Sequence, residues 1–259
     1  MLVDHSLKAV VYWMGNIMKV DKKKVLLSLY FSKMARLNEE ELHKTLPPAK
    51  FIENSNTDTQ GFMFLTGRLM VISFRGSQQA KDWLTDFNAW HTDYPYGNRD
   101  STIQVHKGFI SAYKSVRGEI HAELSRNRNN WDSILVCGHS LGGALATLCA
   151  VDIQYNITNK VECFPSGNPA VGNKAFVKSY NKRVPNTIRT YMKTDIVPFL
   201  PPKWFFRKSK GGYAHTAKAN RIGPRNPFIG LLVWLKAKTG KFGMDDITNH
   251  SIDLYEKYV

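Results

Sequence analysis

The chain has 259 residues, 43% of them hydrophobic and 22% charged, and its 36 basic against 21 acidic residues give a formal net charge of +15. This composition is that of an ordinary globular protein, so it excludes a disordered chain, a collagen-like repeat and a multi-span membrane protein. The length favours one domain spanning residues 1–259, and the positive charge favours an anionic partner.

The N-terminal part of the chain is predicted to be helical. Residues 6–18 are expected to form a helix that packs on the domain, with a surface-seeking amphipathic helix as the alternative. Gly15 and Asn16 interrupt its apolar run and no small-residue cleavage site follows, so no signal peptide is recognisable. We therefore expect the protein to be cytoplasmic or non-classically exported. A second helix is predicted over 24–46, where apolar residues recur on one side and Pro47 follows.

The rest of the chain alternates between strands and helices. Two apolar runs at 62–65 and 69–74 flank Thr66-Gly67, which predicts a hairpin. Further strands are predicted over 133–137, 160–164 and 187–192, and helices over 108–124, 141–153 and 174–182. Such alternation predicts an α/β fold with a largely parallel central sheet.

The most specific motif is Gly-His-Ser-Leu-Gly at 138–142, which fits the pattern G-x-S-x-G. It lies between an apolar strand and a small-residue helix, the context in which this pattern makes a sharp turn that exposes a nucleophile. Such a turn strains the serine backbone, and glycines let the neighbouring segments approach. We therefore predict that Ser140 is a nucleophile and that the N–H of Leu141 is an oxyanion donor. A Gly-rich helix start capped by the serine is the alternative.

A serine nucleophile requires a general base and an acid that orients the base. The downstream histidines are His215 and His250, and position alone favours His250 only slightly. Asp195 follows an apolar run and precedes a proline, so it is expected in a loop at the carboxyl edge of the sheet. Asp152 is expected to face away from the nucleophile, and His139 to point elsewhere and be structural.

Ordered blocks of the sequence from about residue 60 onward resemble the class 3, or fungal-type, lipases. They include Val-Ile-Ser-Phe-Arg-Gly-Ser at 71–77, Val-His-Lys-Gly-Phe at 105–109, Gly-Asn-Pro-Ala-Val-Gly-Asn at 167–173 and Asp-Ile-Val-Pro-Phe-Leu-Pro at 195–201. The block ending at His215 resembles one whose histidine is not the base. His250 with Tyr255 resembles the block that carries the base.

This resemblance implies an α/β-hydrolase fold, with a mostly parallel central sheet, helices on both faces and a short helical lid. It implies Ser140 as nucleophile, Asp195 as the orienting acid and His250 as the general base. It also implies Ser77 as the second oxyanion contributor, with Asp86 holding the Ser77 hydroxyl when the site is open.

The residues that follow the oxyanion loop support such a lid independently. Trp83, Phe87 and Trp90 recur at intervals of four and three residues, so they share one face of a helix. Three large aromatic side chains there would cover an apolar acyl groove when the lid is closed and enter a lipid surface when it is open. Plain packing in the core is the alternative.

Basic residues are concentrated in 196–244, which contains ten Lys and Arg and no Asp or Glu. Aromatic residues beside basic ones suit the interface of an anionic membrane, and we predict a peripheral docking element there. This docking run consists of Trp204, Phe205, Arg207, Lys208 and Lys210. The alternative is a buried strand or helix with a solvated basic face. The chain lacks the patterns of nucleic-acid-binding modules, so no nucleic-acid partner is expected.

The predicted function is hydrolysis of carboxylic esters in lipids through an acyl-enzyme intermediate. Acylglycerols are the preferred substrates, and anionic membrane phospholipids cleaved by a phospholipase A are the alternative. A non-catalytic lipid-binding relative is a third possibility from a different functional class. No cofactor or metal is expected, because the sequence has no Cys/His ligand cluster. Cys137, Cys149 and Cys163 are expected to be buried free thiols.

Overall fold

The structure is a computed structural model, and it describes residues 20–77, 91–94, 102–201, 212–224, 232, 235–236 and 249–259. Several predictions fall outside these residues and stay predictions. They are the helix over 6–18, the lid residues Trp83, Phe87 and Trp90, the supporting Asp86, and the docking run with Trp204, Phe205, Arg207, Lys208 and Lys210.

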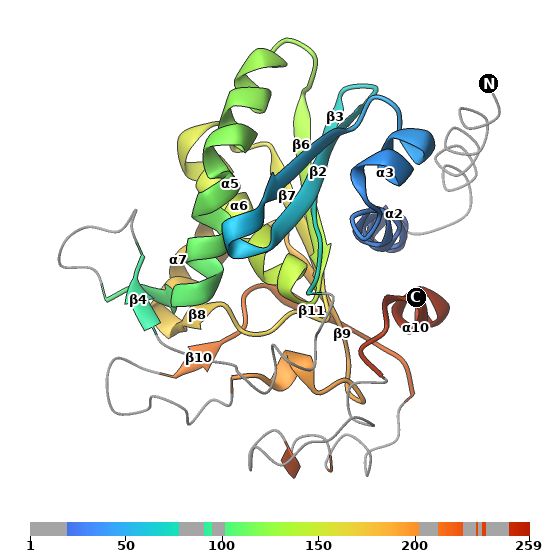
Figure 1. The fold of residues 1–259 in the computed structure, drawn as a ribbon. Coiled ribbons are helices and arrows are strands. Elements are labelled where there is room, and N and C mark those ends of the chain that lie inside the picture. Colours follow the sequence, from blue (N-terminus) through green and yellow to red (C-terminus); the bar gives the residue numbers. More distant parts are fainter. Residues whose placement is uncertain are drawn as a thin grey trace.

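A seven-stranded sheet in the order β1-β2-β3-β6-β7-β9-β11 forms the centre of the described residues (Figure 1). The strands are β1 (Lys50–Asn54), β2 (Thr59–Thr66), β3 (Leu69–Phe74), β6 (Ser133–His139), β7 (Val161–Ser166), β9 (Ile188–Met192) and β11 (Lys218–Ile222). The five strands from β3 to β11 run parallel, and β2 pairs antiparallel with both β1 and β3, so the hairpin predicted at Thr66-Gly67 is confirmed. This confirms the mostly parallel sheet.

Helices cover both faces of this sheet, as predicted (Figure 1). One face carries α5 (Lys107–Arg126), α6 (Leu141–Asn156) and α7 (Lys174–Arg183), and the other carries α2 (Val20–Met34), α3 (Glu39–Thr45) and α10 (Ile252–Tyr258). Each face buries its own hydrophobic cluster. α6 is buried on every side because it lies between the sheet and α5, and its residues from Gly142 to Ile153 are all buried.

The prediction of one helix over 24–46 is wrong in one respect, because the structure has two helices there. α2 ends at Met34 and α3 begins at Glu39. The side chain of Asn38 accepts a hydrogen bond from the Glu41 amide, and the Glu41 side chain accepts one from the Asn38 amide. This capping box gives partners to two amide groups that have no acceptor within the helix because a new helix starts here. The three glutamates at 39–41 form the first turn of α3, where negative charge is favourable.

A second, antiparallel sheet has the order β10-β8-β5-β4. Its strands are β4 (His91–Asp93), β5 (Gln104–His106), β8 (Gly172–Asn173) and β10 (Tyr213–Ala214). These strands have two or three residues each and were not predicted. The edge strand β11 was not predicted either, and it lies within the basic segment 196–244.

The fold brings the ends of neighbouring parallel strands to one edge. β6 ends at His139, β7 at Ser166 and β9 at Met192, so the loops that follow these strands meet there. In an open α/β sheet this carboxyl edge is where ligands bind. None of the helices in the described residues has the length and hydropathy needed to cross a bilayer. The prediction of one domain over 1–259 stays a prediction.

Candidate active site

Ser140 lies at the turn between β6 and α6, with a backbone of φ 61° and ψ −130°. A positive φ is rare for a residue with a side chain, so the predicted backbone strain is present. Glycines make the turn possible, since a Cβ on Gly142 would lie 2.2 Å from the carbonyl oxygen of Phe74. A Cβ on Gly138 would lie 2.3 Å from the Gly142 carbonyl carbon. The strand, the turn and the helix therefore fix where the serine hydroxyl stands.

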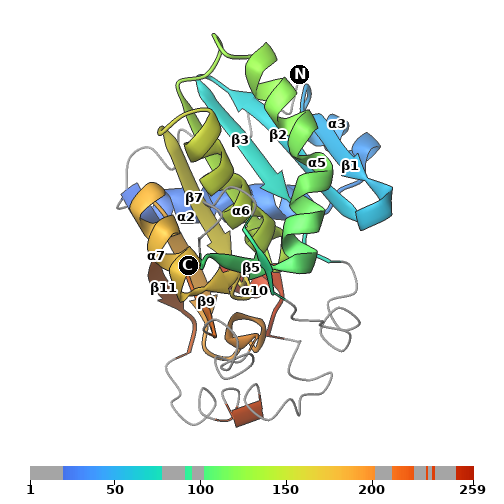
Figure 2. The same ribbon diagram turned by 90° about the vertical axis from the view of Figure 1, so that its left-hand side faces the viewer.

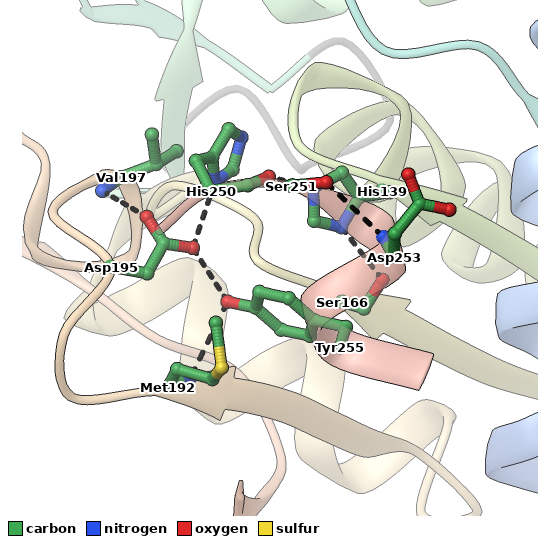
Figure 3. A network of polar contacts seen from close by, with 9 residues as sticks. All are labelled: His139, Ser166, Met192, Asp195, Val197, His250, Ser251, Asp253 and Tyr255. Atoms are coloured by element: carbon green, nitrogen blue, oxygen red, sulfur yellow. Dashed lines mark hydrogen bonds and ion pairs between the residues drawn. The ribbon is translucent and has the colours of Figure 1, made fainter. Parts of the chain in front are cut away.

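Asp195 is fully buried in the loop after β9, at the predicted edge of the sheet. Its Oδ2 accepts hydrogen bonds from Nδ1 of His250 at 2.7 Å and from the hydroxyl of Tyr255 at 2.6 Å, and its Oδ1 accepts one from the Val197 amide at 2.9 Å (Figure 3). Three donors from different parts of the loop and of the C-terminal segment hold this carboxylate in one orientation.

His250 has the tautomer that a general base requires. A carboxylate only accepts hydrogen bonds, so Nδ1 of His250 carries the proton shared with Asp195, and Nε2 of the neutral ring carries the lone pair. Among the described residues, neither Nε2 of His250 nor Oγ of Ser140 has a hydrogen-bond partner, although both atoms are buried. They do not bond to each other here. Such bonds are often long in free enzymes and tighten when substrate binds.

His139 was expected to point away from the other candidate residues, but its ring packs on His250. The two rings stack with centroids 4.6 Å apart, and Nε2 of His139 donates to the carbonyl oxygen of His250 at 2.8 Å. Nδ1 of His139 accepts from the hydroxyl of Ser166 at 3.1 Å (Figure 3). Burial, and then the charge that His250 carries when it is protonated, hold the pKa of His139 well below its ordinary value. His139 is therefore neutral, and it contacts both the ring and the main-chain carbonyl of His250.

Gly167 allows these rings to converge. It follows β7 and has a φ of +56°. A Cβ there would lie 2.7 Å from Cε1 of His139, 3.1 Å from Cε1 of His250 and 3.1 Å from the hydroxyl of Tyr255. Any side chain at this position would push the base and its neighbours apart. A glycine is therefore required both by its backbone conformation and by the space available.

The two predicted oxyanion residues lie beside Ser140. β3 pairs in parallel with β6, with Phe74 opposite Gly138, so residues 75–77 leave the sheet next to Ser140. A Cβ on Gly76 would lie 3.2 Å from Cβ of Ser140, which shows how close this loop comes. Ser77 is the next residue and is half-buried. Leu141 is the first residue of α6, where amide groups have no acceptor within the helix.

The other candidate residues, His215 and Asp152, have different partners in the structure. His250 and not His215 donates to Asp195, and Nε2 of His215 instead contacts the Pro198 carbonyl in the loop that follows Asp195. Asp152 faces α5, as expected, where its Oδ2 accepts from Tyr113, Arg117 and His121.

Two further predictions concern cysteines and metals. Cys137, Cys149 and Cys163 are buried free thiols, as predicted. Burial raises the pKa of Cys137 to about 11 and that of Cys163 to about 12. Within the described residues no three His, Cys, Asp or Glu side chains are grouped to hold a metal ion, and the expected absence of a metal or cofactor stays a prediction.

Comparison with known families identifies the chain. The family model described as Lipase (class 3) matches residues 71–205, which is half of the sequence. The chain belongs to the class 3 lipases. The solved structure of a triacylglycerol lipase, described as having a serine protease triad as its catalytic centre, superposes on this class 3 lipase with a TM-score of 0.68 and 25% identity, covering 82% of this chain and 83% of that one. This confirms the α/β-hydrolase fold.

Two curated relatives share about a third of their aligned residues with this class 3 lipase. Phospholipase A1-IIgamma of Arabidopsis thaliana is 33% identical over 174 residues, which cover 56% of this chain and 42% of the relative. The lipase of Rhizomucor miehei is 32% identical over 166 residues, which cover 62% of this chain and 43% of the relative. The chain therefore matches less than half the length of these two relatives.

Proposed function

We propose that this class 3 lipase hydrolyses the carboxylic ester bonds of acylglycerols, with Ser140 as nucleophile, His250 as general base and Asp195 as the acid that orients it. The observation that carries the proposal is the 2.7 Å hydrogen bond from Nδ1 of His250 to the buried Asp195 carboxylate. It leaves the lone pair of Nε2 without a partner, and the ring of His250 stacks on His139, the residue that precedes the strained Ser140.

In the proposed reaction His250 Nε2 takes the Ser140 hydroxyl proton as the serine oxygen attacks the ester carbonyl carbon. The resulting imidazolium is stabilised by the Asp195 carboxylate. Collapse of the tetrahedral intermediate breaks the ester C–O bond, and His250 returns the proton to the leaving alcohol. Water, deprotonated by His250, then attacks the acyl-serine, and the fatty acid leaves as Ser140 recovers its proton.

The negative charge that develops on the carbonyl oxygen requires donors, for which we propose the amide groups of Ser77 and Leu141. Removing one donor of this kind typically costs about 3–4 kcal/mol of transition-state stabilisation. The start of α6 supports this role, because the N-terminus of a helix favours negative charge. We also propose that Asp86 holds the Ser77 hydroxyl in place when the site is open. Trp83, Phe87 and Trp90 are proposed to form a lid that covers the acyl groove when it is closed.

A phospholipase A that acts on anionic membrane phospholipids is the second candidate. It is supported by the likeness to a protein named phospholipase A1-IIgamma and by the excess of basic residues in 196–244. In both cases we propose that the docking run with Trp204 and Arg207 contacts an anionic membrane beside the acyl groove.

The test of activity uses a soluble short-chain ester and three single variants. Ser140→Ala and His250→Ala are expected to abolish hydrolysis, whereas His215→Ala retains it. Unchanged turnover in Ser140→Ala would overturn the enzymatic function, and loss of activity in His215→Ala alone would overturn the choice of base. The substrate class is tested by fatty-acid release from emulsified triolein against vesicles of phosphatidylglycerol. Faster release from the vesicles would replace the acylglycerol proposal by the phospholipase one.

A further inference from the structure

The positive charge of the chain comes from one continuous stretch. Residues 163–244 contain 16 Lys and Arg against a single acidic residue, Asp195, so this stretch alone accounts for the net +15. All the other residues together contain 20 basic and 20 acidic side chains. Because Asp195 is buried in the candidate active site, the stretch has no acidic side chain to offset its surface charge.

The described part of this stretch gathers six basic residues on α7 and β11, which we name the α7–β11 basic face. It consists of Lys174, Lys178, Lys182, Arg183, Lys218 and Arg221, all exposed. A hydrogen bond of 2.7 Å from the amide of Ala217 to the Asn181 side chain joins the start of β11 to α7. Figure 2 shows the two elements together at one side of the molecule.

None of these six side chains forms an ion pair with any described residue, whereas basic residues elsewhere do. The surface pairs of the described chain include Lys24–Glu162, Lys33–Asp253, Lys44–Glu40, Lys50–Glu119, Arg68–Asp132 and Arg126–Glu123. The basic face thus presents its charge without local neutralisation. A single-sign surface of this kind attracts anions and repels itself until one binds.

An exposed aromatic side chain adjoins this charge. Tyr155, near the end of α6, is 54% exposed, and the guanidinium of Arg183 lies 4.8 Å from the centre of its ring. Tyrosine is favoured where a protein meets the headgroup region of a bilayer, because its ring is apolar and its hydroxyl polar. Nucleic-acid backbones would also attract the charge, but an interfacial tyrosine favours lipid.

The basic face extends to the edge of the sheet where the candidate active site lies. Lys174 follows directly after β8, and Arg221 pairs with Tyr191 near the end of β9. Asp195 is only three residues beyond the end of β9. A membrane held against α7 and β11 would therefore lie beside the loops that carry the nucleophile and the acid.

We propose that the α7–β11 basic face docks this protein on a bilayer rich in anionic phospholipids. This inference deepens the proposed function, since it assumes that the substrate is presented by a lipid surface. It assigns the membrane contact to α7 and the edge strand β11, and it does not depend on the docking run at 204–210. Each basic residue near an anionic bilayer strengthens binding about fivefold, so losing three of them weakens binding on the order of 100-fold.

The test is a vesicle sedimentation assay on the full chain carrying Ser140→Ala, which prevents turnover. The probe is a phosphatidylcholine vesicle with or without phosphatidylglycerol. We expect binding only to the anionic vesicles, weakened by salt. A triple variant, Lys178→Gln, Lys182→Gln and Lys218→Gln, is expected to lose most of this binding.

The matched control removes three charges at the opposite edge of the molecule, through Lys44→Gln, Lys50→Gln and Arg68→Gln, and is expected to bind nearly as well as the parent. Equal losses in the two triple variants, or no loss in the first, would overturn the proposal. So would binding to single-stranded RNA without binding to vesicles. Hydrolysis of a soluble ester by the serine-intact proteins is measured separately. A chain that binds vesicles but cleaves no ester would contradict the proposed function and leave the docking face intact.

Discussion

Replacing His139 with phenylalanine tests how His250, the proposed general base, is held. The imidazole of His139 makes two buried hydrogen bonds, one to the His250 carbonyl at 2.8 Å and one with the Ser166 hydroxyl at 3.1 Å. Phenylalanine keeps a flat ring in the stack on His250 but removes both bonds. Leaving a buried polar group without its partner costs about 1–3 kcal/mol, so we expect the free energy of unfolding to fall by about 2–6 kcal/mol for the two groups.

The expected catalytic effect is larger than this loss of stability explains. Without the bond to its main-chain carbonyl, His250 is free to shift, and a displacement of about 1 Å in an active site costs on the order of 100-fold in rate. We expect kcat on a soluble ester to fall about 10- to 100-fold, with KM little changed because no substrate contact is lost. Titration of active serines with an organophosphate corrects each rate for unfolded protein.

The matched variant is His139→Gln, whose amide can donate to the same carbonyl and accept from Ser166. We expect it to recover part of the lost kcat. If His139→Phe loses stability but keeps its full kcat per titrated serine, His139 is a packing residue only and does not position the base.

Three other results are expected. Tyr255→Phe removes a 2.6 Å hydrogen bond to the Asp195 carboxylate, so denaturant unfolding at neutral pH should show a loss of about 1.5–3 kcal/mol and ester assays a lower kcat; an unchanged midpoint would contradict this. Burial raises the pKa of Cys137 to about 11 and that of Cys163 to about 12, so a thiol reagent should modify no cysteine in the native protein and all three after denaturation; rapid native labelling would argue against the buried thiols. The pKa of His139 lies well below 6.5 in the folded protein, so as pH falls the unfolded chain takes up a proton before the folded protein does. The stability is therefore fully present above pH 6.5 and is lost as pH falls from there toward the lower pKa of the folded state. Urea unfolding from about pH 8 to 5 should show this decline, and His139→Phe should show less of it.

The elements that the sequence predicted well are those in which many consecutive residues favour the same secondary structure. β6 and α6 were predicted because an apolar run leads into a Gly-rich turn and a helix. β5, β8 and β10 have two or three residues each, and they become strands only through pairing with distant segments. The break before α3 had a local signal, since Asn38 and Glu41 have the spacing of a capping box, but the apolar periodicity outweighed it.

The candidate site divides in the same way. Motifs and chain order pointed to Ser140 and Asp195, and the resemblance to a family favoured His250 over His215. The contacts among His139, His250 and Tyr255 join residues more than a hundred positions apart, so no local pattern predicts them. Tyr255 could be singled out only through the resemblance to a family. Gly167 has a positive φ, and the reason that a glycine is needed there is apparent only from the positions of those rings.

The position of α10 has a consequence for biosynthesis. Two of the three hydrogen bonds to the Asp195 carboxylate come from His250 and Tyr255, and α10 is tied to α2 by ion pairs from Lys33 to Asp253 and Glu256. A nascent chain that stops short of His250 has its serine turn but lacks two of the three donors that hold the Asp195 carboxylate. We therefore expect the proposed ester hydrolysis to begin only after the C-terminal residues have been synthesised and α10 has packed against α2.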